Sequence, residues 1–169
     1  MKDTDFQVKQ FKEFHDLLMS TAPEGYSPWF FPVEAQGKNP DALAIMKLAP
    51  EKSLCCNSEW VKRITRDEEK KLQKAEEEGR ELKSIKPKWR CDNCEQTKGS
   101  WHAPHSRITK EQCLSRLKSG GNVGLSAREG DALVLGDIDD VSKLNQVPEN
   151  TLSVTSRKRD GLHFFGWEE

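Results

Sequence analysis

The amino-acid sequence predicts an α+β domain in which helices flank a central, mostly antiparallel sheet. Near the N-terminus, residues 6–19 carry apolar side chains at close to helical spacing. Toward the C-terminus, short apolar runs follow one another closely at residues 122–125, 132–138, 151–156 and 163–167. Helices that precede a group of closely spaced strands are typical of the α+β class. A highly charged segment lies between these parts, so we also expect a charged helical insertion.

Length and composition limit the classes of protein to consider. The chain has 169 residues, which is enough for one domain with a hydrophobic core. Charged residues amount to 33% and hydrophobic residues to 34%, so part of the chain is expected to be extended or solvated. The net charge of -1 excludes strong global basicity, although Arg157, Lys158 and Arg159 form a local basic cluster.

We expect no targeting signal in this sequence. Its apolar runs are too short to span a membrane, and the N-terminal residues lack the apolar core of a signal peptide. We therefore expect a cytoplasmic protein without a membrane partner. In a reducing compartment, the five cysteines indicate free thiols or metal ligands rather than disulfides.

The first half of the chain contains clear element boundaries. The helix at residues 6–19 ends at the Pro/Gly-rich segment TAPEGYSP, and residues 29–33 read as a strand before a turn at residues 36–40. A short helix is expected at residues 41–48, before Pro50.

Two capping boxes predict further helix starts. Thr65 to Glu68 opens a highly charged stretch that extends to about Ile85, and its few apolar residues indicate a solvated arm. Thr109 to Gln112 opens a second helix, which the glycines at residues 120–121 stop.

The stretch DALVLGDIDD, residues 131–140, predicts a strand that ends in carboxylates. Residues two apart on a strand share a face, so Asp137 and Asp139 are expected to project together. Paired carboxylates repel each other unless a cation lies between them, and hard oxygen ligands suit Mg²⁺ or Mn²⁺. The alternative is that these aspartates only end a strand and begin a turn, which is the usual meaning of an isolated DxD.

A second candidate metal site lies in the charged segment. Its ligand types and spacing resemble a small structural zinc site formed by Cys91, Cys94, His102 and His105, in which Cys55 or Cys56 could replace either histidine. The seven residues between the second cysteine and the first histidine are too few for a DNA-reading ββα finger. The alternative is a reduced CxxC loop beside two surface histidines. We expect the flanking Trp89 and Trp101 to pack beside this site; the alternative is that either ring stacks on a base.

Four blocks of the chain occur in an order that is known from one family. They are GYSPWFFPVEAQGKNP, SWHAPHSRITKEQC, GGNVGLS followed by ALVLGDIDD, and TLSVTSRKRDGLHFF. In this order they resemble the N-terminal domain of bifunctional primase-polymerases of the archaeo-eukaryotic primase superfamily. Within it, archaeal chromosomal, plasmid and viral members are the most similar. The blocks cover somewhat under half of the chain.

This resemblance implies a function. It implies a DNA primase/polymerase that transfers nucleotides to DNA by two-metal phosphoryl transfer, with Asp137 and Asp139 as ligands of Mg²⁺ or Mn²⁺. His163 is implied to act with them and to contact the phosphates of the incoming nucleotide. The expected further nucleotide contacts are Lys38, Ser156 and Arg157. The implied partners are a DNA template and primer, nucleoside triphosphates, and a helicase domain or subunit.

The resemblance also implies a division of the chain and exposes one departure. Residues 1–50 and 107–169 are expected to form the catalytic domain, with residues 51–106 as the charged, zinc-binding insertion. The family carries a third acidic residue on a strand after the histidine, but only six residues follow His163 here. We therefore expect the catalytic domain to be C-terminally incomplete. The alternatives are a non-catalytic nucleotide- or DNA-binding module and a zinc-stabilised interaction domain.

Overall fold

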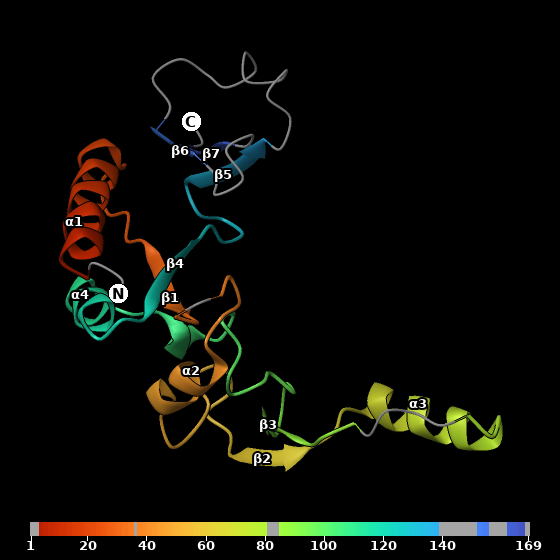
Figure 1. The fold of residues 1–169 in the computed structure, drawn as a ribbon. Coiled ribbons are helices and arrows are strands. Elements are labelled where there is room, and N and C mark those ends of the chain that lie inside the picture. The colour runs from red at the N-terminus through yellow and green to blue at the C-terminus, as the bar shows by residue number, and fades with distance from the viewer. Residues whose placement is uncertain (1–3, 36, 81–84, 139–151, 156–161, 168–169) are drawn as a thin grey trace. The chain divides into compact units, whose positions relative to one another are not determined.

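The computed structural model describes residues 4–35, 37–80, 85–138, 152–155 and 162–167, and it combines helices with small sheets (Figure 1). Its helices are α1 (Thr4–Thr21), α2 (Ala42–Leu48), α3 (Arg66–Glu77) and α4 (Lys110–Lys118), with the 3-10 turn η1 (Pro104–Ser106). Its strands are β1 (Trp29–Val33), β2 (Trp60–Arg63), β3 (Lys88–Cys91), β4 (Asn122–Ser126), β5 (Leu133–Ile138), β6 (Leu152–Thr155) and β7 (Leu162–Trp167).

The strands of the described residues form three small sheets. β1 pairs with β4, β2 pairs with β3, and the third sheet has the order β5-β7-β6. Pairing is antiparallel between β2 and β3 and throughout the third sheet. The mixed α and β character is thus confirmed, but the expected single central sheet with flanking helices is not seen in the described part of the chain. An apolar run predicts an extended segment, whereas the strand it pairs with depends on residues far away in the sequence.

The chain divides into two compact units. The first comprises Met1–Trp29, Leu117–Gly120 and Leu125–Glu169, and the second comprises Phe30–Arg116 and Gly121–Gly124. The predicted insertion, residues 51–106, lies entirely within the second unit.

In the first unit, α1 and β7 are joined by aromatic side chains. The Phe14 and Phe165 rings meet edge to face with centroids 5.2 Å apart, and Tyr26 meets Trp167 in the same way at 4.8 Å. The Trp167 indole also donates a hydrogen bond to Thr21 Oγ1 over 3.2 Å. These contacts attach the end of β7 to the end of the helix that the sequence predicted.

The sheet β5-β7-β6 confirms the three C-terminal strands expected from the sequence. β7 is its middle strand, although it comes last in the chain. Gly136 in β5 is the Cα partner of Phe164 in β7, and a Cβ atom at Gly136 would lie 1.9 Å from the Phe164 ring. Because the ring covers this position, a residue larger than glycine requires the Phe164 ring to move.

In the second unit, the core surrounds β1, α2 and the start of α4. Its buried apolar side chains include those of Phe30, Phe31, Val33, Ile45, Ala103, Ile108 and Cys113. Arg116 of α4 closes this unit, since its guanidinium donates to the carbonyls of Val33 and Asn122 over 2.7 and 2.8 Å. Strand β1, helix α4 and the start of β4 are thereby held together.

Both predicted capping boxes are present. Thr65 exchanges hydrogen bonds with Glu68 at the start of α3, and Thr109 exchanges them with Gln112 before α4. However, α3 ends at Glu77, short of the expected Ile85. Gly79 has a φ of 62° and its N–H bonds to the carbonyl of residue 76, while the N–H of residue 80 bonds to that of residue 75. This Schellman arrangement ends the helix.

Candidate metal centre

Two loops of the second unit bring the cysteines together. The first loop, residues 53–58, precedes β2, and the second loop, residues 91–96, begins at the last residue of β3. Antiparallel pairing makes Trp60 the Cα partner of Cys91, and the N–H of Asp92 donates to the carbonyl of Glu59 over 3.0 Å. The hairpin-like pairing of β2 with β3 therefore places the two loops side by side.

The two loops share one backbone hydrogen-bond pattern. In each loop the N–H of the fifth residue donates to the carbonyl of the first, over 2.8 Å in the first loop and 3.0 Å in the second. The N–H of the first residue donates to the carbonyl of the sixth, over 2.8 and 2.9 Å. The fifth residues, Asn57 and Glu95, have positive φ angles of 51° and 60°. The loops are thus two copies of the same tight turn.

This equivalence assigns corresponding positions in the two loops. Cys56 corresponds to Cys94, and Ser53 corresponds to Cys91. The Ser53 Oγ atom lies 3.0 Å from Cys91 Sγ, and both side chains are buried. Cys55 stands at a position where the second loop has an asparagine. The first loop therefore carries a serine where the second carries its first cysteine, with an extra cysteine two residues later.

Four sulfur atoms converge between the loops. The Sγ atoms of Cys55, Cys56, Cys91 and Cys94 all lie within 4.8 Å of one another. Zinc–sulfur bonds of about 2.3 Å in a tetrahedral site imply sulfur–sulfur distances of about 3.8 Å. The separation of Cys55 Sγ from Cys94 Sγ is 3.2 Å, so small adjustments suffice for such a site. A compact set of four thiols fits a soft, tetrahedral ion such as Zn²⁺.

The thiols differ in how readily they ionise. Burial acts to raise the pKa of Cys91, but the backbone N–H of Cys94 and the Ser53 hydroxyl stabilise the thiolate and lower this pKa to about 6. Desolvation and the neighbouring Cys94 thiol raise the pKa of Cys55 to about 12. The Cys94 side chain likewise raises the pKa of Cys56. One thiolate thus forms easily, and a divalent cation is needed to hold four negative sulfurs so close together.

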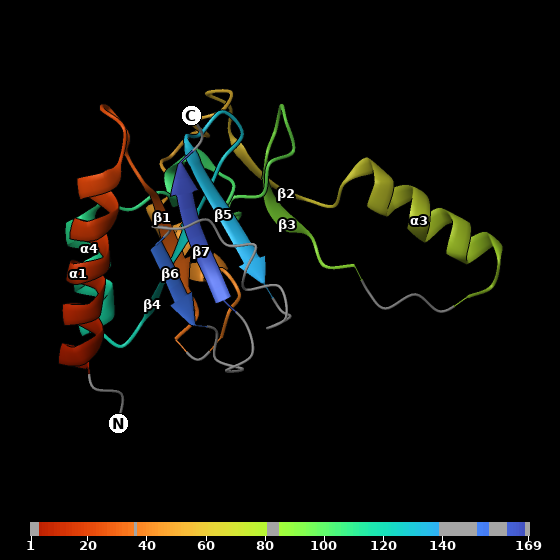
Figure 2. The ribbon, with the colours of Figure 1, turned by 90° about the horizontal axis from the view of Figure 1, so that it is seen from above.

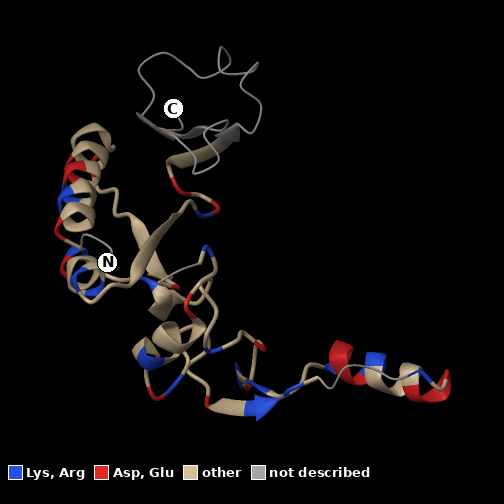
Figure 3. Ribbon diagram, viewed as in Figure 1, with Lys and Arg blue, Asp and Glu red and all other residues tan. Residues whose placement is uncertain are grey.

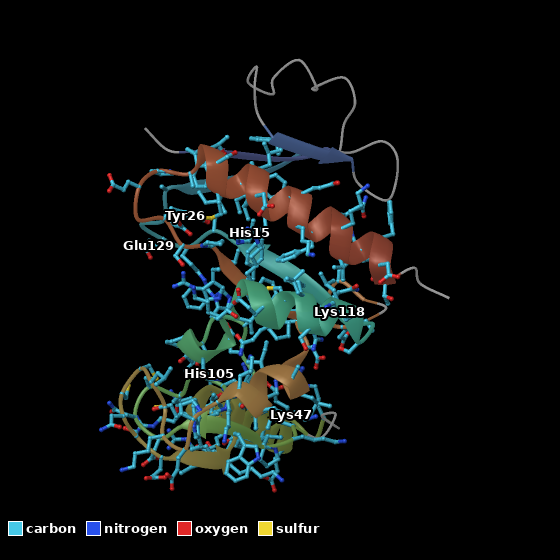
Figure 4. All side chains as sticks on the ribbon, turned by 90° about the vertical axis from the view of Figure 1, so that its left-hand side faces the viewer. His15, Tyr26, Lys47, His105, Lys118 and Glu129 are labelled. Atoms are coloured by element: carbon cyan, nitrogen blue, oxygen red, sulfur yellow. The ribbon has the colours of Figure 1, made fainter. Side chains whose placement is uncertain are left out.

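The two histidines predicted as ligands lie elsewhere in the second unit. Figure 4 labels His105. Its Nε2 atom is 2.7 Å from the Lys98 carbonyl, and its ring meets the Trp60 ring edge to face with centroids 5.6 Å apart. The His102 ring lies against the Trp101 ring with centroids 3.8 Å apart. Among the described residues, the group that could hold a metal ion contains neither histidine.

Sequence reasoning found part of this centre. Cys91 and Cys94 were predicted as ligands, and Cys55 and Cys56 as substitutes for the histidines. Ser53 and both flanking strands were missed. The spacing of Ser53 from Cys56 equals that of Cys91 from Cys94, and this repeated spacing was the available signal.

Asp137, a predicted ligand of magnesium or manganese, lies on β5, and His163, a predicted nucleotide contact, lies on β7, both in the first unit. The backbone of Asp137 is directly opposite that of His163, because the two are Cα partners in the antiparallel register. Asp139, Ser156 and Arg157 lie outside the described residues. Lys38 is exposed in the turn between β1 and α2, in the second unit.

Comparisons with known proteins returned no family model, no curated protein and no solved structure that matches this chain. Within the described part of the chain, no helix has the length and apolar character that crossing a membrane requires.

Proposed function

We propose that this chain is a nucleotidyltransferase domain that primes or extends DNA from nucleoside triphosphates with Mg²⁺ or Mn²⁺. The observation that carries this proposal is the register of β5 with β7, which makes Asp137 the Cα partner of His163. Directly opposite residues in an antiparallel pair share a face of the sheet. The two residues that the resemblance assigns to metal and to nucleotide phosphate are therefore neighbours at one register position.

The proposed chemistry needs that neighbourhood. A triphosphate and its metal ion must be bound together, because the metal neutralises the phosphate charge while the histidine contacts a phosphate oxygen. Asp137 and Asp139 supply hard oxygen ligands for the metal in this proposal, and the triphosphate adds further oxygens. Ser156 and Arg157, which belong to the same unit as Asp137 and His163, are proposed to contact the phosphates. The proposed central sheet of a primase-polymerase would be built around β5 and β7.

In this proposal zinc has a structural role. It would join the two cysteine loops and hold β2 against β3, in a part of the chain that has few buried apolar residues. Figure 1 and Figure 2 show the charged helix α3 projecting away from these strands. The zinc would therefore also fix the point at which this helix joins β2 and β3.

Nucleotide binding with a matched pair of variants tests the proposal. Binding of a nucleoside triphosphate is measured with and without Mg²⁺ or Mn²⁺, and primer extension is measured on the same preparation. We expect Asp137→Asn to abolish the metal-dependent part of binding and the extension. The matched control is Asp67→Asn on α3, which removes the same charge from an exposed residue of the other unit. Equal metal-dependent binding by both variants and the unaltered chain would contradict the proposal.

A second candidate function is a zinc-stabilised nucleic-acid-binding or interaction module without catalysis. The convergence of four cysteine sulfurs favours it, since that site needs no contribution from β5 or β7. A zinc-loaded protein that binds no nucleotide in the presence of Mg²⁺ or Mn²⁺ would support this candidate over the first.

A further inference from the structure

The β2–β3 ribbon, defined as residues 60–63 and 88–91, is strongly basic. Its sequences are WVKR and KWRC, so four of its residues are basic and none is acidic. Figure 3 shows the basic residues of β2 beside the mixed charges of α3 (Figure 3). Because the whole chain has a net charge of -1, this basic ribbon is a local feature.

The register divides the ribbon into two different faces. Lys62 is the Cα partner of Trp89, and Trp60 is the Cα partner of Cys91, so these four residues share one face, which we call the Trp89 face. The opposite face carries the two arginines, Arg63 and Arg90, with Val61 and Lys88.

Carboxylates occupy the arginine face. Arg63 Nη1 lies 3.2 Å from Asp92 Oδ1, and Arg90 Nη2 lies 3.2 Å from Glu68 Oε2. Arg90 is buried and also donates to Thr97 Oγ1 over 3.1 Å. The arginines therefore have structural partners and hold the ribbon to α3 and to the second cysteine loop.

The Trp89 face is different in composition and in partners. Trp89 is 42% exposed, a large fraction for an indole side chain, and Lys62 beside it is exposed. Lys98 adds a second cation, with its Nζ atom 5.5 Å from the Trp60 ring centroid and 6.0 Å from that of Trp89. In the described part of the chain, no carboxylate forms an ion pair with Lys62 or Lys98.

This arrangement is held in place by the backbone. The N–H of Lys98 donates to the carbonyl of Trp89 over 2.8 Å, and the His105 ring nitrogen lies 2.7 Å from the Lys98 carbonyl. The buried Trp60 ring packs against His105, and Cys91, on the same face, belongs to the cysteine group. The exposed Trp89 indole and Lys98 are therefore attached to buried residues of the second unit.

We propose that the Trp89 face binds single-stranded nucleic acid, with a base stacked on the Trp89 indole and neighbouring phosphates beside Lys62 and Lys98. An exposed aromatic ring between cations is the combination that single-strand-binding surfaces use. The strand has to be single, because the bases of a duplex already stack on one another and leave no base face for the indole. That the strand is a DNA template rests on the proposed function, but stacking and phosphate contacts suit any single strand.

Oligonucleotide binding by the full, zinc-loaded chain tests this inference. The probe is a fluorescein-labelled oligothymidylate of about 12 nucleotides, within the usual site size of one binding domain. It is titrated without Mg²⁺, Mn²⁺ or nucleotide. We expect Trp89→Ala to weaken binding about tenfold, because stacking contributes about 1–3 kcal/mol per base, and Trp89→Phe to restore most of the affinity.

The salt dependence of binding supplies a second readout. Each lysine–phosphate contact contributes about 0.7 to the slope of log affinity against log salt concentration for a single strand. Lys62→Gln should lower this slope by about that amount. Lys71→Gln, which removes an exposed lysine of α3, should leave it unchanged. If Trp89→Ala loses zinc, the Lys62→Gln variant tests the inference instead, because the exposed Lys62 side chain does not support either cysteine loop.

Several results would overturn the inference. One is the absence of oligothymidylate binding at low salt, and another is equal affinity for a single strand and for a duplex of the same length. The others concern the variants: equal oligothymidylate affinity of the unaltered chain and of Trp89→Ala that retains zinc, or equal salt slopes for Lys62→Gln and the unaltered chain. Binding of an acidic peptide with the same affinity would also overturn it. This test is independent of the nucleotide-binding test. If the chain binds oligothymidylate equally well with and without Asp137→Asn, the inference about the Trp89 face holds even when no nucleoside triphosphate binds.

Discussion

Asp41 accepts a hydrogen bond from Arg116 over 2.6 Å, although 75 residues separate them in the chain. Asp41 is also the N-cap of α2, where its other carboxylate oxygen accepts from the N–H of Ala44 over 3.0 Å. One carboxylate thus caps a helix and fixes the guanidinium that joins β1, α4 and β4. This pair therefore links parts of the second unit that are far apart in the sequence.

The pair predicts an acid-sensitive contribution to stability. Partial burial acts to raise the pKa of Asp41, but the Ala44 N–H and the Arg116 guanidinium outweigh it and hold this pKa below its usual value. When the pKa of a carboxyl group is lower in the folded protein than in the unfolded chain, its ionised form stabilises the fold. This stabilisation is complete above the pKa of the unfolded chain and is lost as pH falls through the pKa of the folded protein. We expect Arg116→Ala to cost about 2 kcal/mol in free energy of unfolding at neutral pH, and less below about pH 4.

Chemical denaturation across pH measures this effect. The matched control is Lys118→Ala, which removes an exposed cation from the same helix (Figure 4). A cost for Arg116→Ala that stays constant between neutral pH and pH values below about 4 would show that the carboxylate is not its partner.

The cysteine cluster predicts which side chains bind zinc. Substitution of Cys91 or Cys94 by serine should reduce zinc from about one ion per chain to near zero, because each sulfur is one of four tetrahedral ligands. His102→Ala should leave the zinc content unchanged, since that ring lies on Trp101 instead. Metal analysis by plasma mass spectrometry measures both. Zinc loss in His102→Ala, or four freely titratable thiols in the unaltered protein, would refute a tetrathiolate site.

The equivalence of the two loops predicts an unusual rescue. Cys55→Ser should weaken zinc binding, because it removes the sulfur that stands outside the repeated pattern. Adding Ser53→Cys should restore it, because residue 53 occupies the position that Cys91 occupies in the second loop and its Oγ is already 3.0 Å from Cys91 Sγ. Competition with a chromophoric chelator gives the affinities. A double variant as weak as Cys55→Ser alone would mean that the loops are not equivalent as ligand carriers.

Two glycines of the third sheet predict opposite responses to alanine. Gly136→Ala places a methyl group against the Phe164 ring and should cost about 1–3 kcal/mol through overpacking. Gly166→Ala in β7 meets no atom within 4 Å and should be neutral or slightly stabilising, since alanine loses less backbone entropy than glycine. Thermal unfolding of both variants compares them. Equal melting temperatures would show that the Phe164 ring does not cover Gly136.

The sequence by itself determined the local elements of this protein. Helical spacing in residues 6–19 and the two capping boxes predicted α1 and the starts of α3 and α4, because these signals act within a few residues along the chain. The apolar runs predicted β1, β4, β5, β6 and β7 for the same reason. The sequence also contains a local signal for the end of α3 at Glu77, because Gly79 adopts a left-handed conformation that stops the helix. The prediction did not use this glycine and extended the helix to about Ile85.

Only the tertiary structure decided which distant residues meet. Strand pairing set Trp60 against Cys91 and so brought Cys55 and Cys56 to Cys91 and Cys94, while the histidines that are nearer in sequence turned to other partners. Pairing also put β7 between β5 and β6 and His163 opposite Asp137. A short strand signal specifies extension and alternation of faces, whereas its register depends on hydrogen bonds and packing with a segment many residues away.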